Sequence, residues 1–254
     1  QLLDVPHRAW SDEVLAKLGI DKALLASVHE SPEITGKITW RASEETGLAE
    51  GTPVAGGAGD NAAAAVGTGT VRDGRAFVTL GTSGVVFAHT SKLSIDPKGR
   101  VHTFCCAVPG AWHVMGVTQA AGLSLKWFRD TFCGEEIAEA EKRTASQNKY
   151  CDPYQIMDSE AAKIPIGSDR LLYLPYLMGE RTPHLDPNAR GVFFGLSAMH
   201  TKAHLIRAVM EGVAYSQRDS LEVLRSMNVK ISTMIACGGG GTSALWRQML
   251  ADVF

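Results

Sequence analysis

Two apolar segments of this chain run directly into glycine-rich turns that open helical sequences. Residues 52–55 lead through Gly56–Asp60 into an alanine-rich segment, and residues 233–237 lead through Gly238–Gly241 into a helical pattern that Ser243 would cap. Glycine permits the tight turns and close backbone approach that strand-to-helix junctions need. Because strands that alternate with helices in this way are typical of α/β folds, we predict an α/β protein.

Hydrophobic periodicity predicts the remaining elements and a division of the chain. The turn residues Val71–Gly74 mark a predicted boundary between a domain at 1–70 and a domain at 71–254. The segments expected to form strands are 76–80, 85–89, 112–117 and a short buried one at 171–175, and those expected to form helices are 61–66, 122–132, 135–147 and 202–227.

Composition argues against several classes of partner. The net charge is −2, and no apolar run approaches the length of about 20 residues that a membrane helix needs, so we expect neither nucleic acid nor a membrane as partner. The five cysteines are odd in number and contain no Cys-x-x-Cys pair. We therefore expect reduced thiols without disulfides or bound metal, and a cytoplasmic location.

Asp60 is a candidate general base with an ordinary alternative. A carboxylate in a glycine-rich loop can accept the proton of a substrate hydroxyl during phosphoryl transfer. An aspartate directly before Asn61 and four alanines is also a good N-cap for the following helix. The spacing alone favours the cap, and both interpretations stay open at this point.

Two glycine turns are candidate phosphate or nucleotide sites. Gly81–Gly84, with Thr82 and Ser83 between the glycines, could present backbone N–H groups and hydroxyls to an anion, or could be a plain hairpin turn. Gly238–Gly241 precedes the predicted helix start at Ser243, where N–H groups suit phosphate or ribose. Four successive glycines carry a large entropic cost, which favours a functional role for the second turn.

His200 and His204 have the spacing of two metal ligands on one helix face. The glutamate of a His-Glu-x-x-His zinc site and a third ligand are both missing from the pattern. We therefore interpret them as surface histidines at the start of a helix.

Longer segments resemble the FGGY family of carbohydrate kinases. Residues 121–130 are similar to that family's first signature, and residues 191–211 match its second signature at each specified position. Residues 2–11 and 47–54 resemble the segment before the family's catalytic loop, so the resemblance spans nearly the whole chain. Within the family, residues 174–187 resemble the characteristic loop of the xylulokinase branch, part of which gluconate kinases share.

The resemblance implies a fold and roles for individual residues. The implied fold is ribonuclease-H-like (actin-like ATPase), with a mixed sheet flanked by helices, in which 1–70 is the end of one domain and 71–254 most of the next. Asp60 matches the family's proton acceptor. The positions implied to bind the nucleotide are Gly81, Thr82, Ser83, Gly122, Lys126, Gly238, Gly239, Gly240 and Ser243.

The implied reaction transfers a phosphoryl group from ATP, with Mg²⁺, to a sugar hydroxyl, most specifically converting D-xylulose to D-xylulose 5-phosphate. The alternatives are another family sugar such as gluconate, a non-catalytic actin-like nucleotide-binding protein, or a scaffold domain. The oligomeric state stays open, with a homodimer as one candidate. Because full family members are longer, we expect this chain to be a piece of one and predict that the 254 residues alone do not phosphorylate sugar.

Overall fold

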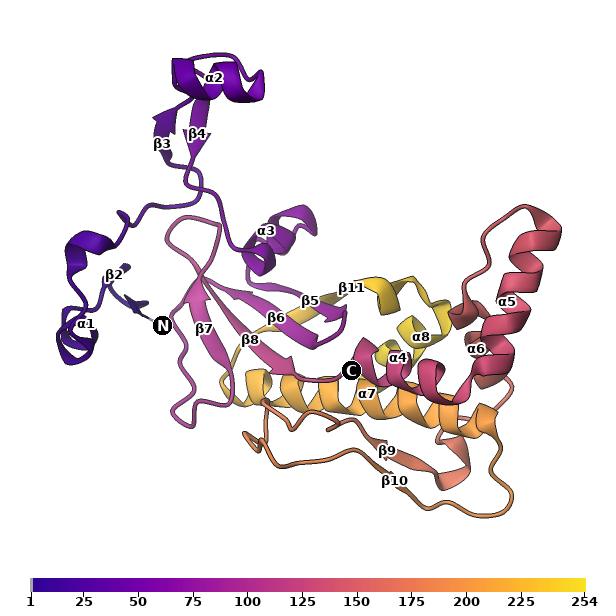
Figure 1. Ribbon diagram of the computed structural model, residues 1–254. Coiled ribbons are helices and arrows are strands. Elements are labelled where there is room, and N and C mark those ends of the chain that lie inside the picture. Colours follow the sequence, from indigo (N-terminus) through magenta and orange to yellow (C-terminus); the bar gives the residue numbers. More distant parts are fainter. Residues whose placement is uncertain (1) are drawn as a thin grey trace.

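A mixed five-stranded sheet forms the centre of the structure, which is a computed structural model that describes residues 2–254 (Figure 1). β11 lies parallel to β5, and every other neighbouring pair is antiparallel. This confirms the predicted α/β class and mixed sheet. In spatial order the strands are β11 (Ile231–Cys237), β5 (Gly74–Leu80), β6 (Gly84–Thr90), β8 (Trp112–Thr118) and β7 (His102–Cys105), of which β7 was not predicted.

Helix α7 (Lys202–Ser226) crosses one face of this sheet (Figure 1). Its apolar side chains share a core with the inward-facing residues of β5, β6 and β8, as the predicted helical stripe requires. On the side of α7 away from the sheet, Gly212 lies so close to the Tyr173 carbonyl that no side chain would fit. The helix is therefore buried on nearly all sides.

The element that packs on this outer side of α7 is the two-stranded pair β9 (Leu172–Leu174) and β10 (Val192–Phe194). A buried strand was predicted here, and that prediction is wrong in part. Tyr173 is buried, but Leu172 and Leu174 are 44% and 40% exposed. A hairpin that covers a helix has one face in solvent, which a short apolar run does not reveal.

The opposite face of the sheet carries a smaller aromatic cluster beneath α3 (Asp60–Gly67). Ala65 of α3 packs against Phe77 and Phe87, whose rings stack with centroids 4.6 Å apart. The His113 ring stacks on Phe87 at 4.3 Å. The alanines of α3 allow this close approach, since a larger side chain would hold the helix away from the sheet.

Four helices gather near the ends of β5 and β11 (Figure 1). Contacts link α4 to α5, α5 to α6, and each of α4, α6 and α8 to α7. The four helices are α4 (Gly122–Phe132), α5 (Gly134–Gln147), α6 (Pro153–Ala161) and α8 (Ala244–Val253), and α6 was not predicted.

No helix in residues 2–254 is long and apolar enough to cross a membrane.

Residues 2–58 form an arm that extends from the sheet and consists of short elements (Figure 1). It touches the sheet where the Arg8 guanidinium lies 4.3 Å from the Trp112 ring centroid and its Nη2 donates to the Ala111 carbonyl at 3.0 Å. Its elements are β1 (Leu3–Asp4), β2 (Ala9–Trp10), α1 (Asp12–Leu18), β3 (Ile34–Lys37), α2 (Trp40–Thr46) and β4 (Pro53–Ala55). The predicted boundary at 71–74 falls between α3 and β5 and stays a prediction.

All five cysteines are free thiols, as predicted.

The interpretation of His204 as a surface residue is wrong. His204 is 9% exposed, its Nδ1 accepts from the Thr201 N–H at 3.1 Å, and its Nε2 donates to Asp169 Oδ2 at 3.1 Å. It closes a capping box at the start of α7, a role that histidine shares with the more usual Glu or Gln.

Candidate functional site

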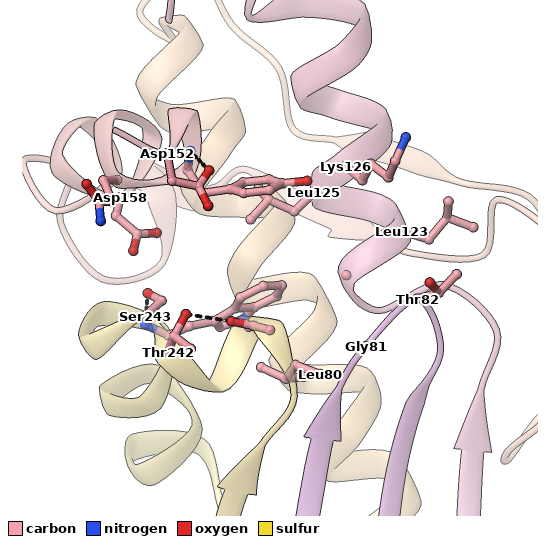
Figure 2. A pocket seen from close by; sticks show the side chains of 16 residues that line it. Leu80, Gly81, Thr82, Leu123, Leu125, Lys126, Asp152, Asp158, Thr242 and Ser243 are labelled. Carbon is pink, nitrogen blue, oxygen red and sulfur yellow. Dashed lines mark hydrogen bonds between the residues drawn. The ribbon is translucent and has the colours of Figure 1, made fainter. Parts of the chain in front are cut away.

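A pocket of about 620 Å³ opens at the carboxyl ends of the parallel strands β5 and β11. In open α/β sheets the crevice outside the carboxyl ends of the strands is the usual place for a ligand. Its walls come from the turn after β5, from α4 and α6, and from the glycine turn after β11 with the start of α8 (Figure 2).

The pocket gathers most of the residues that the sequence singled out. Gly81, Thr82, Gly122, Lys126, Gly239, Gly240 and Ser243 line it. Three others do not: Ser83 follows Thr82 in the turn, Gly238 lies against the end of β5 at Thr79 and Leu80, and Asp60 lies on α3. Segments that are more than 160 residues apart in the chain therefore meet at one site.

The Gly81–Gly84 turn is both a hairpin turn and part of the pocket. It joins the antiparallel strands β5 and β6, where Leu80 pairs with Gly84. Helix α7 packs against this turn at Gly84, where a side chain would clash with Gln217 of the helix. Gln217 is itself held in place, since its Nε2 donates to Thr118 Oγ1 at 2.6 Å. The two interpretations of this turn are therefore compatible.

Helix α4 begins directly against this turn. The Gly122 N–H donates to the Gly81 carbonyl at 2.7 Å, and the Leu123 N–H donates to the Thr82 carbonyl at 3.2 Å. A Cβ at Gly122 would lie 2.6 Å from the Gly81 carbonyl oxygen, so only glycine allows this approach. These N–H groups thus hold the turn in place, in contrast to helix N-termini whose first N–H groups face a ligand.

The four-glycine turn forms one wall of the pocket. It folds into a short 3₁₀ segment, Gly239–Thr242, and Ser243 then caps α8 by accepting from the Trp246 N–H at 3.0 Å, as predicted. A Cβ at Gly240 would lie 2.7 Å from Leu80 Cβ and 2.9 Å from the Trp246 ring. Gly240 therefore lets the backbone lie flat on an apolar surface, while a Cβ at Gly239 would meet nothing within 4 Å.

Lys126 lies on the pocket wall, one turn into α4. Its Nζ donates to Asp130 Oδ2 at 2.6 Å, and the Arg129 guanidinium contacts the same carboxylate. The two cations hold the pKa of Asp130 below its usual range. Exposed i,i+4 pairs of this kind are weak, so a nucleotide phosphate could compete with Asp130 for the ammonium group.

Sequence reasoning missed the contribution of α6. Asp152, Tyr154, Gln155 and Asp158 all line the pocket. The signal for this helix was present, because Asp152 followed by proline at the first helical position is a typical helix start, and Asp152 Oδ1 does accept from the Tyr154 N–H at 3.0 Å. Nothing local, however, indicates what this helix packs against.

Asp60 lies outside the pocket and is exposed. The alternative of an N-cap role is wrong, because Gly59 is the N-cap and the helix begins at Asp60 itself. Asp60 Oδ1 accepts from the N–H of Asn61 at 2.7 Å. Its carboxylate at the first helical position is favoured by the helix dipole and remains accessible.

The described residues contain no group of three His, Cys, Asp or Glu side chains able to hold a metal ion. Within residues 2–254 the site thus offers polar groups, glycine backbone and apolar walls, but no resident metal centre. A mostly apolar pocket with a few placed polar groups is typical of small-molecule sites.

Comparison with known proteins identifies the family of the chain. The carboxy-terminal domain of the FGGY family of carbohydrate kinases matches residues 76–254, and its amino-terminal domain matches residues 1–67. The xylulose kinase of Bacillus subtilis (strain 168) is 36% identical over 253 residues, which cover 100% of this chain and 48% of that protein. The gluconokinase of the same organism is 35% identical, with 96% of this chain and 47% of that protein covered.

The fold agrees with solved structures of the same family. A crystal structure of a "xyloylose kinase" from Brucella ovis superposes with a TM-score of 0.84 at 38% identity, covering 98% of this chain and 48% of that one. The chain thus spans about half the length of the curated relatives it matches. With both family domains represented and the signature regions in place, the chain belongs to the FGGY family of carbohydrate kinases.

Proposed function

We propose that this chain holds the nucleotide-binding part and the catalytic carboxylate of a kinase that transfers a phosphoryl group from ATP to a hydroxyl of a small sugar, with D-xylulose as the sugar. The observation that carries the proposal is the pocket between Gly81–Thr82 and Gly239–Ser243, at the ends of two parallel strands. The family assignment and the xylulose kinase relatives support the same reaction.

The pocket residues divide into two groups by their chemistry. The turn at Gly81–Thr82, together with Lys126, provides the polar backbone, hydroxyl and cation that suit the phosphates. The apolar residues Leu125 and Trp246 and the glycine turn suit the adenosine. ATP is used as its Mg²⁺ complex, and the described residues supply no metal site of their own.

In this proposal Asp60 accepts the proton of the attacking sugar hydroxyl. An exposed carboxylate is available for that role, and it lies outside the nucleotide pocket as a group on the acceptor side should. Removing a proton as the new bond forms makes the hydroxyl oxygen a better nucleophile. The remaining catalytic work in phosphoryl transfer is positioning and charge stabilisation.

Gluconate is the second candidate for the sugar. The Bacillus subtilis gluconokinase is nearly as similar to this chain as the xylulose kinase of the same organism, at 35% against 36% identity. A solved gluconate kinase from Lactobacillus acidophilus superposes with a TM-score of 0.84. The two sugars differ in charge, since only gluconate is an anion, so a kinetic comparison separates them.

The test is ADP release by the complete gene product with xylulose, gluconate, ribulose and glycerol side by side. We expect kcat/KM to be highest for xylulose, and we expect no turnover from the 254 residues alone. A preference for gluconate would support the second candidate. Nucleotide binding without turnover of any sugar would support a non-catalytic actin-like protein, and absence of nucleotide binding would support a scaffold.

A further inference from the structure

Helix α6 places polar side chains at the end of the pocket that lies away from the Gly81 turn. Figure 2 shows Thr82 and Leu123 at one end, and Asp158 opposite Ser243 at the other. Asp158 is half-buried. Burial raises the pKa of its carboxyl, and the neighbouring Ser243 hydroxyl offsets part of that rise. A carboxylate can accept several hydrogen bonds, so beyond its contact with Ser243 the Asp158 carboxylate can also accept from a ligand in the pocket that it lines.

Between these two ends the pocket has apolar walls. On one side lie Leu125 and the Tyr154 ring, which the Arg129 guanidinium covers at 4.7 Å from its centroid. On the other side lies the Gly239–Gly240 backbone, where Gly240 rests on Leu80 and Trp246. Trp246 is held in place because its Nε1 donates to the Met210 carbonyl of α7 at 2.9 Å. A slot between aliphatic, aromatic and glycine surfaces suits a planar heterocycle.

The order of these groups sets the direction of a bound nucleotide. With phosphates at the Gly81 turn, the base lies in the apolar slot and its outer edge reaches Asp158. A carboxylate only accepts hydrogen bonds, so at the exocyclic position of the base it favours an amino group over an oxygen. Adenine presents an exocyclic amino group, whereas hypoxanthine presents a carbonyl oxygen at the same ring position.

We propose that α6 selects the nucleotide base, and that Asp158 accepts a hydrogen bond from the exocyclic amino group of adenine. The proposal rests on the proposed function, because it requires the phosphates to lie at the Gly81 turn. It adds a specificity-determining residue, Asp158, that the sequence resemblance did not indicate. The alternative role for this carboxylate, binding the ribose hydroxyls, gives a different experimental result.

The test is calorimetric titration of the 254-residue chain with ADP, with inosine diphosphate and with 2′-deoxy-ADP, at pH 8. We expect the unchanged chain to bind ADP at least about tenfold more tightly than inosine diphosphate, because an oxygen facing the carboxylate leaves both unpaired. Asp158→Asn should remove or reverse that preference, since an amide can donate to the oxygen. Asp158→Ala should remove it without reversal.

Glu160→Gln on the same helix is the matched control, because it makes the same carboxylate-to-amide change outside the pocket lining. It should keep the ADP preference of the unchanged chain. Circular dichroism and thermal unfolding of each variant show whether it is folded. If one of Asp158→Asn and Asp158→Ala does not fold, the other still tests the proposal.

The outcomes distinguish the two proposals. If the unchanged chain binds ADP and Asp158→Asn keeps the same preference over inosine diphosphate, base selection by Asp158 is wrong and the proposed function stands. If Asp158→Asn instead changes the ratio between ADP and 2′-deoxy-ADP, the carboxylate binds ribose and this inference is overturned. If the unchanged chain binds no nucleotide, both proposals fail for this pocket.

Discussion

The arm at residues 2–58 and the body at residues 74–254 are built in opposite ways. In the arm, Leu15 is the one buried side chain, and apolar residues such as Leu24 and Trp40 are 79% and 66% exposed. In the body, α7 is buried along most of its length on nearly all sides, and the core runs continuously from the sheet to α8. The body can thus hold a preformed pocket, whereas the arm has little to hold its own elements together.

Asp60 lies where these two regions meet, on α3, which rests on the sheet through Ala65. The proposed function therefore assigns nucleotide binding and proton transfer to separate parts of the chain. Binding should need only the body, while chemistry should need Asp60 and the surface that presents the sugar. The predictions that follow test this separation.

The largest effect is expected from Asp60→Asn. In the complete gene product, we expect kcat to fall by about 10²-fold or more, because an amide cannot accept the hydroxyl proton. Binding of ADP should be unchanged, since Asp60 is not part of the pocket lining. Steady-state kinetics and calorimetry measure the two quantities. Glu44→Gln, at an exposed acid of the arm, is the control, and an unchanged kcat in Asp60→Asn would remove the general-base role.

Glu211→Ala should cause the largest loss of stability in the body. Glu211 is buried and accepts from Arg207 Nε at 2.7 Å, from the Gly167 N–H at 3.0 Å and from Ser168 Oγ at 3.1 Å. Its removal leaves the buried Arg207 guanidinium without its charge partner, which costs about 3–5 kcal/mol in the free energy of unfolding. Urea unfolding followed by circular dichroism measures it.

The matched control for that experiment is Glu222→Ala on the same helix. Glu222 is 49% exposed and pairs with Arg218 and Arg225 at the surface. Exposed pairs contribute little, so the expected loss is below about 1 kcal/mol. Equal losses in the two variants would show that the ion pair inside the body is no more important than one at its surface.

His113→Phe should reduce the acid sensitivity of the body. Burial lowers the pKa of His113 from 6.5 to about 4, so its neutral form is favoured in the folded state. Stability from this group is present above pH 6.5 and is lost as the pH falls towards 4, because the unfolded chain takes up the proton first. At pH 5 the free energy of unfolding is therefore about 2 kcal/mol lower than above pH 6.5 because of this group.

Phenylalanine can keep the stacking on Phe87 and does not titrate. The variant should therefore lose about 2 kcal/mol less between pH 7 and pH 5 than the unchanged chain, as measured by urea unfolding at both pH values. If the free energy of unfolding fell equally in both proteins, His113 would take up its proton as readily in the folded state as in the unfolded state, and the prediction would be wrong.

The smallest effect is expected from Trp40→Ala in the arm. A side chain that is 66% exposed contributes little to packing, and the free energy of unfolding should change by no more than about 0.5 kcal/mol. Trp246→Ala in the body, at 2% exposure, should cost about 3 kcal/mol or more. If Trp40→Ala cost as much as Trp246→Ala, the contrast between arm and body would be wrong.

Local patterns were sufficient for much of this fold. The strands at 76–80, 85–89 and 112–117 and the helices at 122–132 and 202–227 were predicted within a few residues, as was the cap at Ser243. Hydrophobic period, glycine turns and capping residues act over a few neighbouring positions, so the sequence displays them directly. The family resemblance then indicated which glycines to examine.

The tertiary structure alone decided how distant elements meet. It placed Asp158 of α6 opposite Ser243, buried His204 in a capping box, and left Asp60 outside the pocket. It also exposed both leucines of β9, because that strand covers a helix instead of entering the sheet. Each of these outcomes depends on which surface packs against which, and contacts between positions far apart in the chain leave no local period to read.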